Sequence, residues 1–199
     1  IDEFFNTTSN TVGHGFNLVD ADALEGFACY SFVPKSDIPL KVIVLDNTQR
    51  DNDGDPGIHG HGFLDEARWT WLKKELADGD AAGQLMIIAA HIPIGVEALN
   101  SKMEWWDNPL NAVSLEDLVT ELHSHPNFFM WIAGHRHVNA IKAFPGPTPE
   151  QGFWQVETSS LRDWPQQGRA FEIYLNADYT ISIVATQIDP AVKEGTPAA

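Results

Sequence analysis

Two histidines, His135 and His137, flank a single arginine directly after Gly134. An apolar run at 128–133 leads into this segment, and an alternating apolar stretch at 138–144 follows it. The pattern predicts a strand, a tight glycine turn and a second strand, with two imidazoles at the turn. Side chains two residues apart in an extended or tightly turned segment project to the same side, so both rings are expected to face one cleft. Because imidazole is a common ligand of divalent metals, the segment predicts a metal site.

A third histidine, His91, directly follows a buried apolar strand that we expect at 84–90. A single histidine at the end of a strand is more often structural than a ligand. The same strand-then-histidine arrangement recurs at His135, however, and the carboxyl ends of parallel strands meet at one edge of a sheet. The pairing therefore favours His91 as a partner of the two histidines at the turn.

Other histidines and two tryptophans are weaker candidates for a site. His59 and His61 form a second His-x-His pair, but no apolar strand precedes them to orient the rings, so a solvated or substrate-facing loop is expected. His14 lies between two glycines, in a surface loop or at the wall of an active site. Trp105 and Trp106 lie in a loop that we expect either to face the substrate or to pack as an ordinary surface loop.

The elements that would position these residues alternate between strands and helices. A helix is expected at 64–76, ended by Asp78-Gly79 and with Arg68 at the margin of its apolar face. A second helix, capped by Ser114, is expected to end near His123, and His123 and His125 are interpreted as structural. Strands are expected at 27–34, 41–46, 84–90, 128–133, 138–144, 153–158, 170–175 and 180–186.

Composition restricts the class of protein. The chain has 199 residues, 43% of them hydrophobic, which is enough for one folded domain. A formal net charge of -16 argues against a nucleic-acid surface, because phosphate neutralisation requires clustered Lys and Arg. The lone Cys29 cannot form an intramolecular disulfide. No apolar run has the length of a membrane span, and no segment resembles a signal peptide, so localisation stays open.

Taken together, these pieces resemble the calcineurin-like metallophosphoesterase family. The resemblance rests on the strand that ends in Leu45-Asp46, on Ala90-His91-Ile92-Pro93, and on Gly134-His135-Arg136-His137. It covers residues 27–186 and only the C-terminal part of that family's domain. It implies an α/β fold, the C-terminal part of a four-layer α/β/β/α sandwich with mixed sheets. It also implies two divalent metal ions (Mn, Fe or Zn), with His91 and His135 as ligands of one and His137 as a ligand of the other.

The sequence also departs from the family's pattern. The family's first half supplies Asp-x-His, Gly-Asp-x-x-Asp and Gly-Asn-His, and none of these occurs in the 199 residues. We therefore expect residues 1–188 to be the C-terminal portion of a single domain, with an irregular loop at 1–26 and a tail at 189–199. The chain begins at Ile1, which suggests a processed or truncated piece. The histidine expected to be catalytic would lie upstream, and no catalytic role is assigned to Asp46 or Arg136.

The function implied by the resemblance is hydrolysis of a phosphate monoester or diester of a small substrate by a dinuclear metal site. We expect the longer protein to carry this activity, and the chain alone to be weakly active or inactive without the missing N-terminal half. Two alternatives remain at this point. One is a non-catalytic binding module on the same fold. The other is a structural single-zinc protein that uses His91, His135 and either His137 or His59.

Overall fold

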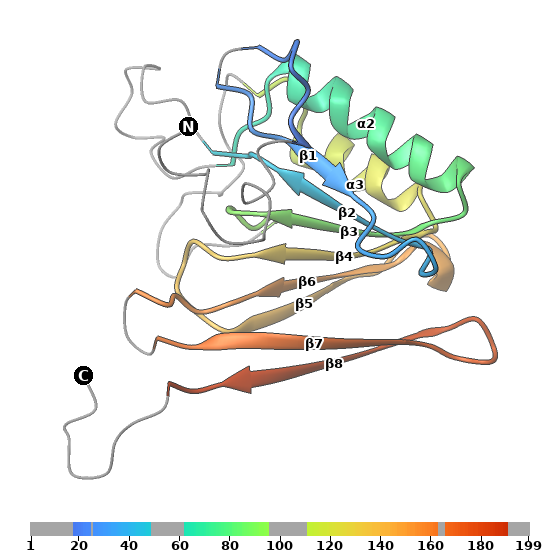
Figure 1. Ribbon diagram of the computed structural model, residues 1–199, viewed down its shortest axis with the longest axis vertical. Coiled ribbons are helices and arrows are strands. Elements are labelled where there is room, and N and C mark those ends of the chain that lie inside the picture. The colour runs from blue at the N-terminus through green and yellow to red at the C-terminus, as the bar shows by residue number, and fades with distance from the viewer. Residues whose placement is uncertain (1–17, 25, 49–61, 96–110, 163–165, 191–199) are drawn as a thin grey trace.

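The computed structural model describes residues 18–24, 26–48, 62–95, 111–162 and 166–190. Two helices and eight strands in these ranges form a mixed α/β fold (Figure 1). The helices are α2 (Glu66–Ala81) and α3 (Leu115–His123), and a short 3₁₀ turn, η3, covers Pro149–Gln151. The strands are β1 (Tyr30–Phe32), β2 (Leu40–Leu45), β3 (Leu85–Ala90), β4 (Phe128–Ala133), β5 (Ala140–Phe144), β6 (Phe153–Glu157), β7 (Gly168–Leu175) and β8 (Ile181–Ile188).

Six strands form one mixed sheet in the order β1-β2-β3-β4-β6-β5. β2, β3, β4 and β6 pair in parallel, whereas β1 and β5 pair antiparallel at the two edges. The arrows of the four parallel strands therefore point to the same side, which is the left in Figure 1. Their carboxyl ends meet there, which is the edge where open α/β sheets place their ligands.

Both helices cover one face of this sheet (Figure 1). Leu72 and Leu76 of α2 and Leu118 and Leu122 of α3 are fully buried against it, together with Trp131 of β4. Ser114 caps α3 as expected, because its hydroxyl accepts a hydrogen bond from Asp117 N. This helical layer therefore supports the sheet from one face.

The end of α2 differs from the sequence prediction. The helix does not stop at Asp78-Gly79 but continues to Ala81. Gly79 is buried inside it, and a Cβ at this position would lie 2.2 Å from Met86 Sδ, so glycine is needed for packing and not for a turn. The turn glycine is Gly83, whose φ is +64°. Gly83 N donates to Asp80 O and Gln84 N to Gly79 O, which is a Schellman ending.

The antiparallel hairpin β7–β8 lies against the other face of the sheet. Its inward side chains Phe171, Ile173, Ile181 and Ile183 pack on a small cluster that includes Ile87 and Met130. The described residues thus form three layers: helices, six-stranded sheet and hairpin. A cavity of about 790 Å³ opens between the two strand layers.

The predicted strands are confirmed, with differences at their ends: β7 begins two residues earlier and β8 ends two residues later than expected. The strand expected at 138–144 begins only at Ala140, because the preceding residues belong to the turn after β4. The strand expected at 27–34 is shortened to β1. Within the described ranges, the helices are too short or too polar to cross a membrane.

Candidate functional site

A shallow cavity of about 440 Å³ lies at the carboxyl edge of the sheet. It is bordered by the last residues of β2, β3 and β4 and by Asp46, His91 and Thr158, each of which directly follows a strand. Its walls are mainly small or aliphatic, and His91 is the histidine among the residues that line it. The strand-then-histidine pattern of the sequence thus places His91 at the predicted edge.

His91 and His135 meet across this edge, as the sequence predicted. His91 Nε2 lies 3.1 Å from His135 Nδ1, and the two rings are nearly perpendicular, at 77°, with centroids 4.9 Å apart. Two nitrogen ligands, each about 2.1 Å from one ion and about 90 to 109° apart around it, are separated by about 3.0 to 3.4 Å. The pair therefore has the spacing of two ligands that share one divalent ion.

The environment favours the neutral form of His91. Desolvation lowers its pKa below the ordinary value, and the nearby charge of His137 lowers it further. Neutral imidazole offers a lone pair, which is the form that binds a metal.

The backbone that carries His91 is held by four hydrogen bonds, three of them buried. Asn47 is fully buried, and its amide donates to Ile92 O at 2.7 Å and accepts from Ile92 N at 3.0 Å. Gln155 Oε1 accepts from Ile94 N at 2.7 Å. Gly134 N donates to His91 O at 3.0 Å, which ties the two histidine segments together. These contacts fix the direction in which His91 leaves β3.

The segment after β4 is a tight turn, as the sequence predicted. His135 and His137 both have positive φ, 73° and 55°, so their relative direction is set by left-handed backbone. Arg136 between them turns to the sheet and forms a two-pronged ion pair with Glu157, the last residue of β6. The relative direction of the two histidines thus follows from this turn backbone and not from alternation along a strand.

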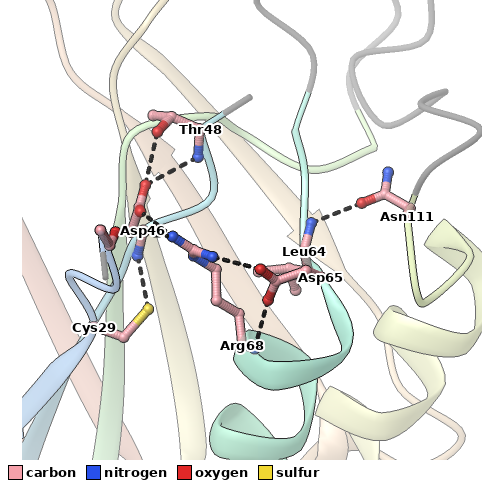
Figure 2. A network of polar contacts seen from close by, with 8 residues as sticks. Cys29, Asp46, Thr48, Leu64, Asp65, Arg68 and Asn111 are labelled. Atoms are coloured by element: carbon pink, nitrogen blue, oxygen red, sulfur yellow. Dashed lines mark hydrogen bonds and ion pairs between the residues drawn. The ribbon is translucent and has the colours of Figure 1, made fainter. Parts of the chain in front are cut away.

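A second polar network joins β2 to α2 beside the cavity (Figure 2). Arg68 lies between Asp46 and Asp65 and forms ion pairs with them of 2.8 and 2.6 Å. Cys29 Sγ accepts a hydrogen bond from Asp46 N, and Asp46 Oδ1 also accepts from Thr48. Arg68 is only 6% exposed, so a residue expected at the margin of the helix face is buried together with its ion pairs.

Sequence reasoning missed Asn47, Gln155 and Glu157. A signal for the last two was present: Gln155 and Glu157 are polar residues two positions apart in an otherwise apolar strand, and therefore share one face. No comparable local signal marks Asn47, because its partner Ile92 lies 45 residues away.

The remaining candidates fall into two groups. His14, His59, His61, Trp105 and Trp106 lie outside the described residues. The two histidines interpreted as structural contact neighbouring elements. The His123 ring lies against Phe153, and His125 Nδ1 lies within hydrogen-bond distance of Asp80 Oδ2, at 2.5 Å. Within the part of the chain that the structure describes, no three His, Cys, Asp or Glu side chains are grouped closely enough to hold a metal ion. Among the described residues, His91 and His135 thus form a close pair without a third such side chain beside them.

The chain is similar to known proteins in both sequence and structure. No family model matches the chain. The chain is 22% identical over 162 residues to the manganese-dependent ADP-ribose/CDP-alcohol diphosphatase of Xenopus tropicalis, covering 78% of this chain and 44% of that protein. The Xenopus laevis protein of the same name is 20% identical over 162 residues, covering 78% and 42%. The chain thus spans less than half the length of these relatives.

A solved structure, a dimetal phosphatase from Danio rerio, superposes with a TM-score of 0.54 at 16% identity. The match covers 82% of this chain and 60% of that one. At this identity the likeness shows the fold alone. The chain therefore shares the fold of this dimetal phosphatase over most of its length.

Proposed function

We propose that this chain supplies part of the active site of a metal-dependent phosphoesterase. In this proposal His91 and His135 bind one divalent ion, and His137 binds a second. The observation that carries it is the 3.1 Å separation of His91 Nε2 and His135 Nδ1 at the carboxyl edge of a parallel sheet. The names of the relatives, which are manganese-dependent diphosphatases, favour this function over a binding module or a structural zinc site.

The chemistry of the site follows from its donor set. Two bound divalent ions would offset the charge of a phosphate, lower the pKa of a bound water and stabilise the leaving oxygen. Imidazole ligands are neutral, so they leave the positive charge of the ions available to the substrate. This matters in a chain with a formal net charge of -16, whose overall field repels phosphates.

A diphosphate of the nucleoside class is the proposed substrate. The relatives are named for ADP-ribose and CDP-alcohol, both of which contain such a diphosphate. The cavity of about 440 Å³ at the sheet edge is within the size range of small-molecule sites. Manganese is the metal that the same names suggest.

The remaining metal ligands are proposed to come from outside these 199 residues. The sequence contains no Asp-x-His, Gly-Asp-x-x-Asp or Gly-Asn-His segment. A divalent ion bound by His91 and His135 alone would lack most of its ligands. We therefore expect the chain alone to bind Mn²⁺ weakly and to hydrolyse phosphate esters slowly, and a longer protein that contains it to be active.

The test measures Mn²⁺ binding by calorimetry and hydrolysis of ADP-ribose with Mn²⁺, for the chain and for the longer protein. His91→Ala and His135→Ala should each abolish measurable Mn²⁺ binding by the chain and reduce the longer protein's activity at least about 100-fold. The matched control is His123→Gln, because His123 packs on Phe153 and ends α3 at the opposite end of the sheet. Unchanged Mn²⁺ binding in both alanine variants would refute the ligand assignment, and full activity of the chain alone would refute the incomplete site.

A further inference from the structure

The turn that carries His135 and His137 has a backbone that its residues disfavour. Both histidines have positive φ, 73° and 55°, and they flank Arg136. In this left-handed region the Cβ of a non-glycine residue lies too close to the following carbonyl oxygen. Such conformations persist only where the surrounding structure holds them. The turn therefore needs an external contact that fixes it.

Arg136 and Glu157 supply such a contact. Arg136 Nε donates to Glu157 Oε1 at 2.8 Å, and a second guanidinium nitrogen donates to Oε2. Both carboxylate oxygens are thus engaged, in the fork geometry that lysine cannot reproduce. Because Arg136 is the residue between the two histidines, fixing its side chain restricts the backbone of both neighbours.

Glu157 itself is held by the sheet. It is the last residue of β6, where it pairs with Ala133 on one side and Ala140 on the other. Ala133 is the last residue before the turn, and Ala140 is the first strand residue after it. The turn therefore passes over the end of β6, and the Glu157 side chain reaches the middle of the turn from a fixed base.

Burial makes this contact hard to replace. Glu157 is 1% exposed, and the Arg136 side chain is 17% exposed. A buried carboxylate without its cation is strongly disfavoured, so turn conformations that withdraw Arg136 are disfavoured too. The same pair then selects the conformation in which His135 Nδ1 faces His91 Nε2.

We propose that Glu157 is a positioning residue, which acts through Arg136 to hold His135 and His137 in the arrangement that meets His91. Its consequence for metal binding rests on the proposed function, but the arrangement of the rings does not. Neither Glu157 nor Arg136 is proposed to touch a metal or a substrate. Outer contacts of this kind set the orientation of metal ligands, and their loss lowers metal affinity about 10- to 100-fold.

The test uses Glu157→Gln in the full chain, with two readouts. Through-space NMR contacts between the His91 and His135 rings report the arrangement without any metal, and calorimetry with Mn²⁺ alone reports affinity. We expect the ring contact to be lost and Mn²⁺ affinity to fall at least about 10-fold, while circular dichroism stays that of the folded chain. The matched control is Glu172→Gln, in an exposed position of β7.

A second variant covers the possibility that Glu157→Gln does not fold. Arg136→Met combined with Glu157→Met removes both charges at once, so no unpaired charge stays buried. The proposal expects this double variant to fold and to lose the ring contact. Retention of the contact in either folded variant would overturn the proposal. A wild-type chain that shows the ring contact but binds no Mn²⁺ would count against the proposed function, while the variants would still test the positioning role.

Discussion

Cys29 shows how strongly the environment beside the site acts on a single side chain. It is 1% exposed, and its Sγ accepts a hydrogen bond from Asp46 N at 3.3 Å. Burial raises the pKa of the thiol from 9.0 to about 12, and the nearby Arg68 offsets only part of that effect. The thiol is therefore neutral at physiological pH, and the thiolate, which is the reactive form, is strongly disfavoured.

We expect iodoacetamide to label Cys29 in the folded chain at pH 8 much more slowly than in the urea-unfolded chain, because reaction requires local opening.

The raised pKa of Cys29 also makes the free energy of unfolding depend on pH. The folded state holds the thiol proton more tightly than the unfolded state. The protonated thiol therefore contributes fully to the free energy of unfolding below the unfolded pKa near 9.0, and this contribution is lost as pH rises towards about 12. Urea unfolding at pH 8 and pH 10.5 should thus show a larger loss for the wild type than for Cys29→Ala. Equal losses, or equally fast labelling in both states, would contradict this prediction.

At the scale of elements, Arg68 joins the start of α2 to the end of β2 (Figure 2). Its guanidinium pairs with Asp65, the N-cap of α2, and with Asp46, the first residue after β2, and it also donates to Gly26 O at 3.2 Å. One buried cation thus satisfies two carboxylates from separate elements. Since Asp46 borders the cavity, the contact also defines that wall of the candidate site.

We expect Arg68→Met to lower the free energy of unfolding by about 3 kcal/mol, because it leaves two partly buried carboxylates without their cation. The matched control is Lys74→Met on the same helix, which removes the exposed ion pair with Asp78. Because both groups of that pair are exposed to solvent, its loss should change the free energy of unfolding very little. Chemical unfolding followed by circular dichroism measures both. Similar effects for the two variants would show that burial does not give the Arg68 pairs their importance.

The role of a residue could be predicted from the sequence where its partner is close in the chain, and not where its partner is distant. Ser114 was recognised as a cap because the backbone amide it binds is three residues away. His91 and His135 were paired because each follows an apolar run, and the end of such a run marks the carboxyl end of a strand. Gly79 was misread as a stop because the side chain that excludes a Cβ there, Met86, belongs to the next strand. The ion pair of Arg68 with Asp46 was not predicted for the same reason, since the two residues are 22 positions apart.

At the scale of the whole molecule, the two faces of the six-stranded sheet are packed very differently. The helix face carries a large core in which Leu72, Leu76, Leu118 and Leu122 are fully buried. The opposite face contacts the hairpin through a small buried cluster, and the cavity of about 790 Å³ lies between hairpin and sheet. An isolated two-stranded hairpin is marginally stable, so β7–β8 depends on this limited contact.

Because the hairpin buries less apolar surface than the helices, we expect β7–β8 to separate from the sheet before the six-stranded sheet itself unfolds. In hydrogen exchange followed by mass spectrometry, amides of β7 and β8 should exchange at least about 10-fold faster than those of β3 and β4, because their opening exposes little apolar surface. Ile183→Ala, on the inward side of the hairpin, should accelerate exchange in β7 and β8 and leave β3 nearly unchanged. The matched control is Val184→Ala, because Val184 is the neighbouring residue and is 45% exposed. Equal protection of hairpin and sheet, or acceleration throughout the chain in Ile183→Ala, would mean that the two layers unfold as one cooperative unit.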